Sequence, residues 1–270
     1  MKLLGRLIRY IRLHLFNNPK YFFSYIIRYF DPYFKLDIKY FEADNINSIL
    51  ETGRSIIRFG DGEVYLMNRG GLSFQKYEVS LRDLFFKIID EYEEDSPYVL
   101  GLNRLPLSKT NRELKKHKLL SCWLPSKIYY HLYFNKKVNY FDASFFYYRD
   151  SIPKYFESYL LGKKLIFVAN KNYIDMLSQD NNIPFKNIKY VNTPPTDAYS
   201  EYESIKAQIQ KLVVKNGREN SVVLVSFGPA GKAIAFELAK DGIQVIDVGQ
   251  GIEVAYKDKD HIITDTLNVL

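Results

Sequence analysis

The stretch IIRFGDGE, residues 56–63, places two carboxylates one residue apart directly after a hydrophobic run. Glycines, including Gly60, alternate with Asp61 and Glu63 and let the backbone turn tightly. Mg²⁺ and Mn²⁺ bind to one or two carboxylates and fill their other positions with water and phosphate oxygens. The pair therefore predicts a divalent metal site, with Arg58 facing the same phosphates. Helix capping is the alternative, because an acid beside a helix N-terminus can accept its free amides.

A second informative stretch, residues 221–251, is typical of a strand, a glycine turn, a helix, a turn and another strand. Gly228 and Gly231 remove side chains from the turn, and Lys232 adds a positive charge to the helix amides, so the turn could bind a phosphate. The spacing G-x-x-G-K matches neither a dinucleotide fingerprint nor a P-loop. Asp247 ends the next strand, where a ribose-binding acid would lie, so an NAD or adenosyl-methionine site stays an alternative.

Short β-branched runs alternate with longer helical patterns beyond residue 45, which indicates an α/β chain built from parallel units. Strands are expected at 54–60, 97–102, 164–170, 187–192, 221–227 and 243–248, and helices near 78–94, 199–216 and 230–241. Ligands bind at the carboxyl edge of such sheets, where both informative stretches would lie. We expect one domain, residues 45–270, preceded by a helical extension, residues 1–44.

Composition limits the classes of function. The chain has 270 residues, of which 47% are hydrophobic, so it can fill a sizeable core. Its net charge of +7 suits a polyanion, an anionic lipid surface or a phosphorylated small molecule equally, and we do not expect a nucleic-acid partner. A single cysteine, Cys122, and four scattered histidines predict neither a disulfide nor a zinc site. These features favour a cytoplasmic protein.

The N-terminal stretch MKLLGRLIRYIRLHLF predicts a basic amphipathic helix rather than a signal peptide, because three arginines interrupt its apolar run. Such a helix could pack on the domain. It could also attach to the inner face of the cell membrane or to a partner protein. The next apolar stretch, YFFSYIIRYF, is too short to span a bilayer and contains Arg28.

Three stretches occur together in this chain: RFGDGE near the start of the domain, TPPTDAYSEYESI in the middle, and SFGPAGK followed by IDVGQG near the end. Over residues 45–256 this combination resembles the GT-D fold glycosyltransferases. The resemblance implies a Rossmann-like, mostly parallel sheet with helices on both faces. It also implies nucleotide-sugar-dependent transfer, notably of glucose from UDP-glucose onto glycans of bacterial serine-rich adhesins, with a metal at a DxE motif.

By this resemblance Asp61 and Glu63 correspond to the metal motif, and Arg58 and Gly60 border it. Gln250 follows a glycine where other members often carry His, so no role is carried over to it. Further residues are expected at the nucleotide sugar because they end strands or begin the glycine turn: Asn103, Asn170, Ser226, Gly228, Gly231 and Lys232.

Transfer of a sugar from a nucleotide sugar requires two kinds of chemical group. Negative charge develops on the departing diphosphate, and a metal, helix amides and basic side chains can stabilise it. An inverting reaction also needs a carboxylate that accepts the proton of the acceptor hydroxyl. The candidates, each of which could instead be a cap or a loop residue, are Asp142, Asp197, Asp247 and Glu253.

The sequence thus predicts a metal-dependent glycosyltransferase that moves a sugar from a UDP-linked donor to a bacterial glycan or glycoprotein. One alternative is another Rossmann-like enzyme, such as a methyltransferase or an NAD-dependent dehydrogenase. A second is a non-catalytic subunit whose basic helix docks on a membrane complex. In an enzyme that resembles this family, the same helix could contact other glycosyltransferases.

Overall fold

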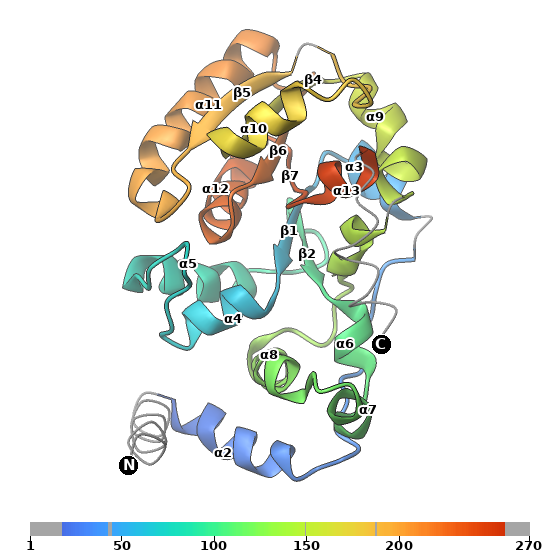
Figure 1. Cartoon of the computed structure of the whole chain (residues 1–270), viewed down its shortest axis with the longest axis vertical. Coiled ribbons are helices and arrows are strands. Elements are labelled where there is room, and N and C mark those ends of the chain that lie inside the picture. The colour runs from blue at the N-terminus through green and yellow to red at the C-terminus, as the bar shows by residue number, and fades with distance from the viewer. Residues whose placement is uncertain (1–17, 43–44, 149, 187, 257–270) are drawn as a thin grey trace.

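In the described part of the chain, the fold is built around one sheet of seven strands in the order β3-β2-β1-β7-β6-β4-β5, with every neighbouring pair parallel (Figure 1). This computed structural model describes residues 18–42, 45–148, 150–186 and 188–256. The strands are β1 (Ser55–Phe59), β2 (Tyr98–Leu102), β3 (Phe141–Asp142), β4 (Lys164–Asn170), β5 (Lys189–Thr193), β6 (Ser221–Ser226) and β7 (Val245–Asp247).

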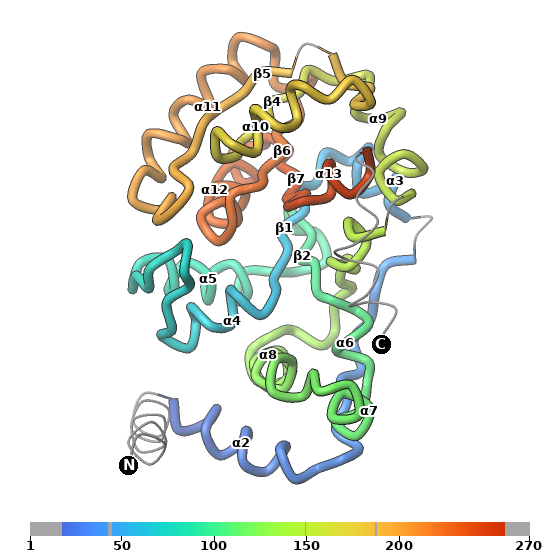
Figure 2. Tube along the Cα trace, in the orientation of Figure 1, coloured from blue at the N-terminus to red at the C-terminus, as the bar shows by residue number. Residues whose placement is uncertain are grey.

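Helices cover both faces of the sheet (Figure 2). One face packs against α5 (Val79–Asp90), α11 (Tyr202–Asn216) and α12 (Pro229–Lys240). The other packs against α3 (Ile46–Glu51), α9 (Glu157–Leu161), α10 (Lys171–Ser178) and α13 (Gly251–Tyr256). Successive residues along a strand serve opposite cores, so that Ile56 lies in the second cluster and Ile57 in the first. Because both faces are covered, β1, β2 and β7 are buried along their whole length, whereas the edge strand β5 is largely exposed.

The remaining helices lie beyond the carboxyl edge of the sheet, and the first of them, α2, precedes the sheet in the chain. They are α2 (Pro19–Tyr29), α4 (Asp61–Met67), α6 (Arg104–Ser108), α7 (Asn111–Lys116) and α8 (Leu120–Tyr133). Short segments of other helix types complete the fold: η2 (Ala143–Tyr147), η3 (Ile152–Phe156) and η4 (Ala198–Glu201).

The predicted α/β class is confirmed, with helices on both faces of a parallel sheet. All six expected strands are present, and β4 has the expected bounds. The seventh strand, β3, was missed because two residues give no periodic signal. The three expected helices correspond to α5, α11 and α12.

Helix α8 was not predicted, and its composition explains why. It is apolar on most sides and contains Pro125 in its interior, so it lacks a clear helical stripe. Lys127 is fully buried in it and donates to the carbonyl oxygens of Phe34 and Lys109 at 2.6 and 2.8 Å. Burial lowers the pKa of Lys127 to about 8. The lysine therefore ties α8 to the two segments beside it.

Helix α2 packs on α8 through its polar and aromatic inner side. Asn18 accepts a hydrogen bond from the hydroxyl of Tyr133 at 2.9 Å, and the rings of Tyr21 and Tyr129 lie 5.0 Å apart. The amphipathic helix expected over residues 1–16 lies outside the described residues. Among the described helices, none combines the length and the apolar character that crossing a bilayer requires.

Candidate functional site

Four charged side chains gather at the carboxyl edge of the sheet: Arg58, Glu63, Lys232 and Asp247. Lys232 Nζ lies 3.3 Å from Glu63 Oε1 and 3.0 Å from Asp247 Oδ2. Arg58 Nη2 lies 3.3 Å from Asp247 Oδ1. None of the four is more than 8% exposed, and two positive charges balance two negative ones. We call these residues the buried charge cluster.

Strand order brings the cluster together from segments far apart in the chain. Arg58 lies in β1, and Asp247 ends β7, the neighbouring strand. Their contact includes the backbone, since the amide of Arg58 donates to Asp247 Oδ2 at 3.3 Å. Glu63 stands in the first turn of α4, directly after β1, and Lys232 in the first turn of α12, after β6. The informative stretches around residues 60 and 230 therefore meet at one edge, as the sequence predicts.

Mutual pairing keeps Asp247 and Lys232 ionised although they are buried. Burial alone would raise the pKa of Asp247, but Arg58 and Lys232 outweigh it and hold the pKa below its ordinary value. Burial would lower the pKa of Lys232, but the charges of Asp247 and Glu63 raise it above its usual range. Asp247 therefore has a low affinity for a proton, which suits positioning of the two cations better than general-base catalysis.

Asp61 lies on the open side of this cluster. It is exposed at the first position of α4, and its Oδ1 accepts the amide of Gly62 at 3.0 Å. Its Oδ2 lies 3.6 Å from the sulfur of Cys122 on α8. Partial desolvation and the charge of Asp61 raise the pKa of Cys122 to about 11, so the thiol is neutral and can donate. Asp61 thus keeps a carboxylate that a ligand can reach.

Glu63 has the capping contact that the sequence left open. Its Oε2 accepts the amide of Gly60 at 2.8 Å, and its Oε1 faces Lys232. Capping and ion pairing thus engage both oxygens of Glu63, whereas Asp61 forms no ion pair with any Lys or Arg among the described residues. Within the described ranges, no three His, Cys, Asp or Glu side chains form a group that could hold a metal ion.

Arg58 makes its contacts inside the protein. Besides Asp247, its guanidinium reaches the carbonyl oxygen of Ala143 at 3.5 Å and lies 5.2 Å from the ring centre of Phe146. The sequence predicts that Arg58 faces phosphates directly. In the structure Asp247 already pairs with its guanidinium, so a phosphate would compete with that carboxylate for Arg58.

The two asparagines expected to line the pocket differ in their surroundings. Asn103 follows β2 and donates to the hydroxyl of Ser144 at 3.3 Å. A Cβ added to Gly60 would meet both Glu63 Oε2 and Asn103 Oδ1, within 3.5 and 4.0 Å, so Asn103 borders the cluster. Asn170 ends β4 and caps α10 by accepting the amide of Tyr173 at 3.0 Å.

The other carboxylates proposed as proton acceptors have structural partners. Asp142 caps η2 and accepts the backbone amides of Ser144 and Arg104 at 2.9 and 3.1 Å. Asp197 has a positive φ of 52° and pairs with Lys76 at 2.7 Å. Glu253 is buried on α13, which follows β7. Asp142 and Asp197 thus act as a cap and a loop contact, the competing roles that the sequence left open.

The aromatic side chain of Phe74 packs against the glycine turn before α12. Gly228 has a φ of 69°, and a Cβ there would lie 3.0 Å from the ring of Phe74. Ser226 ends β6, half-buried, and Gly231 is buried in the first turn of α12. The loop that carries Phe74 is fixed in place, because the Asp197 amide donates to the Phe74 carbonyl at 2.8 Å.

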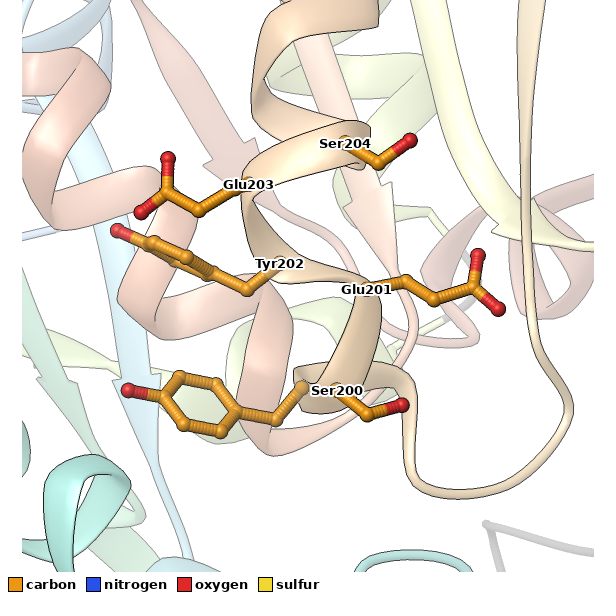
Figure 3. Close-up of a pocket in the computed structure, with 6 residues that line it drawn as sticks. Ser200, Glu201, Tyr202, Glu203 and Ser204 are labelled. Carbon is orange, nitrogen blue, oxygen red and sulfur yellow. The ribbon is translucent and has the colours of Figure 1, made fainter.

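A surface hollow at the start of α11 is lined by six consecutive residues, 199–204 (Figure 3). The side chains of Tyr202 and Glu203 lie on one side of the helix, and those of Glu201 and Ser204 on the other. None of the six belongs to the buried charge cluster, and these side chains do not converge on one point. The carboxyl edge therefore remains the candidate site.

Gly249 is a site residue that the sequence did not single out, although it lies within IDVGQG. Its φ is 52°, and a Cβ at this position would overlap Nη2 of Arg58. Gly249→Ala should therefore displace the guanidinium from Asp247 and lower the free energy of unfolding by about 2–3 kcal/mol. Urea denaturation measures the loss.

The matched control is Gly53→Ala. Gly53 also has a positive φ, of 72°, but a Cβ there meets nothing within 4 Å. In this variant the free energy of unfolding should fall only by the cost of placing alanine in a left-handed backbone conformation, about 1 kcal/mol. Equal losses in both variants would show that contact with Arg58 does not constrain Gly249.

Comparison with known proteins gives this geometry a family. Residues 56–259 match the model of the family described as "Glycosyltransferase GT-D fold". The chain is 24% identical over 220 residues to "Probable glycosyl transferase Gly" of Streptococcus gordonii and 22% identical over 218 residues to "Glycosyltransferase GlyD" of Streptococcus pneumoniae serotype 4. Each match covers 76% of this chain but only 30% and 26% of those relatives, so the chain spans less than a third of their length.

Solved structures share the fold. One, titled "The highly conserved domain of unknown function 1792 has a distinct glycosyltransferase fold", superposes with a TM-score of 0.64 at 24% identity and covers 85% of this chain and 82% of its own. Another, "A New Glycosyltransferase (DUF1792) from Streptococcus sanguinis", superposes with a TM-score of 0.60 at 20% identity and covers 79% of this chain and 82% of its own. With its parallel sheet and with most of its length matched by the family model, this chain belongs to the GT-D fold glycosyltransferase family.

Proposed function

We propose that this protein transfers a hexose, namely glucose, from a UDP-sugar to a glycan or glycoprotein of the bacterial surface. The observation that supports it most is the meeting of two turns at the carboxyl edge. There Lys232, beside the glycine turn, lies 3.3 Å from Glu63 of the DxE stretch. Family membership and the names of the relatives point to the same activity.

In this proposal Asp61 is the primary protein ligand of a divalent cation. The donor set fits such an ion, because Mg²⁺ and Mn²⁺ often bind through one or two carboxylates and complete their shell with water and substrate phosphates. Asp61 is exposed, whereas Glu63 would have to share an oxygen that now faces Lys232. With one freely accessible carboxylate, the site should bind the metal weakly alone and more tightly together with a diphosphate.

The chain's own residues would then hold the donor. The N-terminus of α12 presents backbone amides beside Gly228, which suits a diphosphate. Asp247 holds Lys232 and Arg58 in place, and these two would add net positive potential once Glu63 turns its charge toward the cation. A bound cation would neutralise the charge that develops on the departing diphosphate. The low proton affinity of Asp247 leaves the general base unassigned among the carboxylates of this edge.

The test is a thermal-shift panel with UDP-glucose, other UDP-sugars, NAD and adenosyl-methionine, each with and without Mn²⁺. We expect a UDP-sugar to raise the Tm only when Mn²⁺ is present, and neither component to do so alone. Release of UDP from the same donor would then measure turnover. A shift with NAD or adenosyl-methionine that ignores the metal would contradict the proposal and favour another Rossmann-like enzyme. Absence of any nucleotide effect would favour a non-catalytic subunit.

A further inference from the structure

Helix α2 presents its apolar side to solvent. Phe23, Ile26, Ile27 and Phe30 recur at the spacing of one helical face, and their exposed fractions are 57, 42, 65 and 78%. We call these four residues the α2 stripe. Tyr33, just beyond the helix, is 72% exposed and lengthens the apolar surface. Scattered exposed apolar residues are ordinary, but a contiguous stripe marks a surface that something covers.

The opposite side of α2 is already used, so the helix cannot simply turn its stripe inward. Tyr21 is 1% exposed, and its ring packs 5.0 Å from Tyr129 of α8. At the other end, the carbonyl oxygen of Arg28 accepts a hydrogen bond from Asn111 at 2.6 Å. These contacts fix the rotation of α2 and direct the stripe away from the protein.

The charge of the N-terminal part of the sequence, together with the exposed basic residues at the two ends of the stripe, points to its occupant. Residues 1–30 contain six Lys and Arg residues and no Asp or Glu, so they carry six of the seven net positive charges of the chain. Lys20 and Lys35, on either side of the stripe, are exposed. Phenylalanine and tyrosine beside basic residues suit the boundary between lipid headgroups and acyl chains, where apolar rings are buried and cations meet anionic phosphates.

We propose that the α2 stripe docks this protein on the surface of an anionic lipid bilayer. The helix would lie in the plane of the interface, with the stripe buried and the basic residues at headgroup level. Helix α8 contacts α2 on one side and α4 on another, so docking would turn the carboxyl edge of the sheet toward the membrane (Figure 1). This inference does not depend on the sugar donor or on catalysis.

Flotation of the full-length protein with vesicles tests the proposal. The probes are vesicles of phosphatidylcholine alone and vesicles of phosphatidylcholine with about a third phosphatidylglycerol. We expect the wild type to float with the anionic vesicles and to remain behind with the neutral ones, and high salt should release it. The variant Phe23→Ser/Ile27→Ser/Phe30→Ser should lower the bound fraction about 10-fold or more, because it removes three apolar anchors.

A matched control changes equally exposed apolar residues elsewhere: Val79→Ser/Leu161→Ser/Val214→Ser, on α5, α9 and α11. This variant should float like the wild type, and both variants should keep the wild-type Tm. Equal flotation of the stripe variant and the wild type would overturn the proposal, as would wild-type binding that ignores lipid charge or is absent.

Two further results would assign the stripe to another occupant and so overturn the proposal. If the wild type is a dimer in size-exclusion chromatography and the stripe variant a monomer, with no flotation of either, the stripe joins two copies of this chain. If only a variant lacking residues 1–16 floats, that segment covers the stripe.

Discussion

Asp61→Asn should lower the rate of sugar transfer from the UDP donor by about 100-fold or more, because it removes the accessible carboxylate expected to meet the metal and diphosphate. Asparagine keeps an oxygen that can accept the amide of Gly62, so the free energy of unfolding should change by no more than about 0.5 kcal/mol. Steady-state release of UDP at saturating Mn²⁺ measures the rate, and urea denaturation measures the stability.

The control for this prediction is Glu113→Gln. Glu113 is another exposed acid in the first turn of a helix, α7, where it accepts the amide of Thr110 at 2.7 Å. The same loss of charge there should leave transfer unchanged. If Asp61→Asn retains at least half of the wild-type rate, Asp61 serves the helix terminus alone, and the proposed metal site is wrong.

Asp247→Asn should destabilise the protein by about 3–5 kcal/mol, because it leaves Arg58 and Lys232 buried with only Glu63 to balance them. The lowered pKa of Asp247 sets the pH dependence. At pH values between the folded and the unfolded pKa of Asp247, the unfolded chain binds one more proton than the folded chain. The stabilisation that Asp247 provides is therefore present above about pH 4 and is lost as the pH falls through the folded pKa. Urea denaturation at pH 7 and at pH 3 should therefore show a smaller difference between variant and wild type at the lower pH.

Asp83→Asn provides the matched comparison. Asp83 also pairs with an arginine, Arg82, at 3.1 Å, but its side chain is 60% exposed. An exposed pair contributes little, so this variant should lose no more than about 1 kcal/mol at either pH. If Asp247→Asn also lowers the free energy of unfolding by no more than about 1 kcal/mol, the buried charge cluster does not hold the carboxyl edge together.

The sequence alone determined the class of fold and the position of the two informative turns. Strands β4 and β6 are recognisable because a parallel sheet covered on both faces requires continuous apolar runs. The acids around residue 61 and the glycine turn at residue 228 follow such runs directly, so their place at the carboxyl edge follows from local pattern.

Only the tertiary structure decided which of these charges are paired. Arg58 and Asp247 lie 189 residues apart in the chain, and their contact depends on β1 and β7 being neighbours, which no local pattern specifies. Burial then determines what each group can do, since Glu63 faces Lys232 while Asp61, two residues earlier, remains exposed. The same reason applies to α2. Contacts of Tyr21 with α8 turn one side of this helix inward and leave the stripe outside, which the spacing of its aromatic and aliphatic residues does not specify.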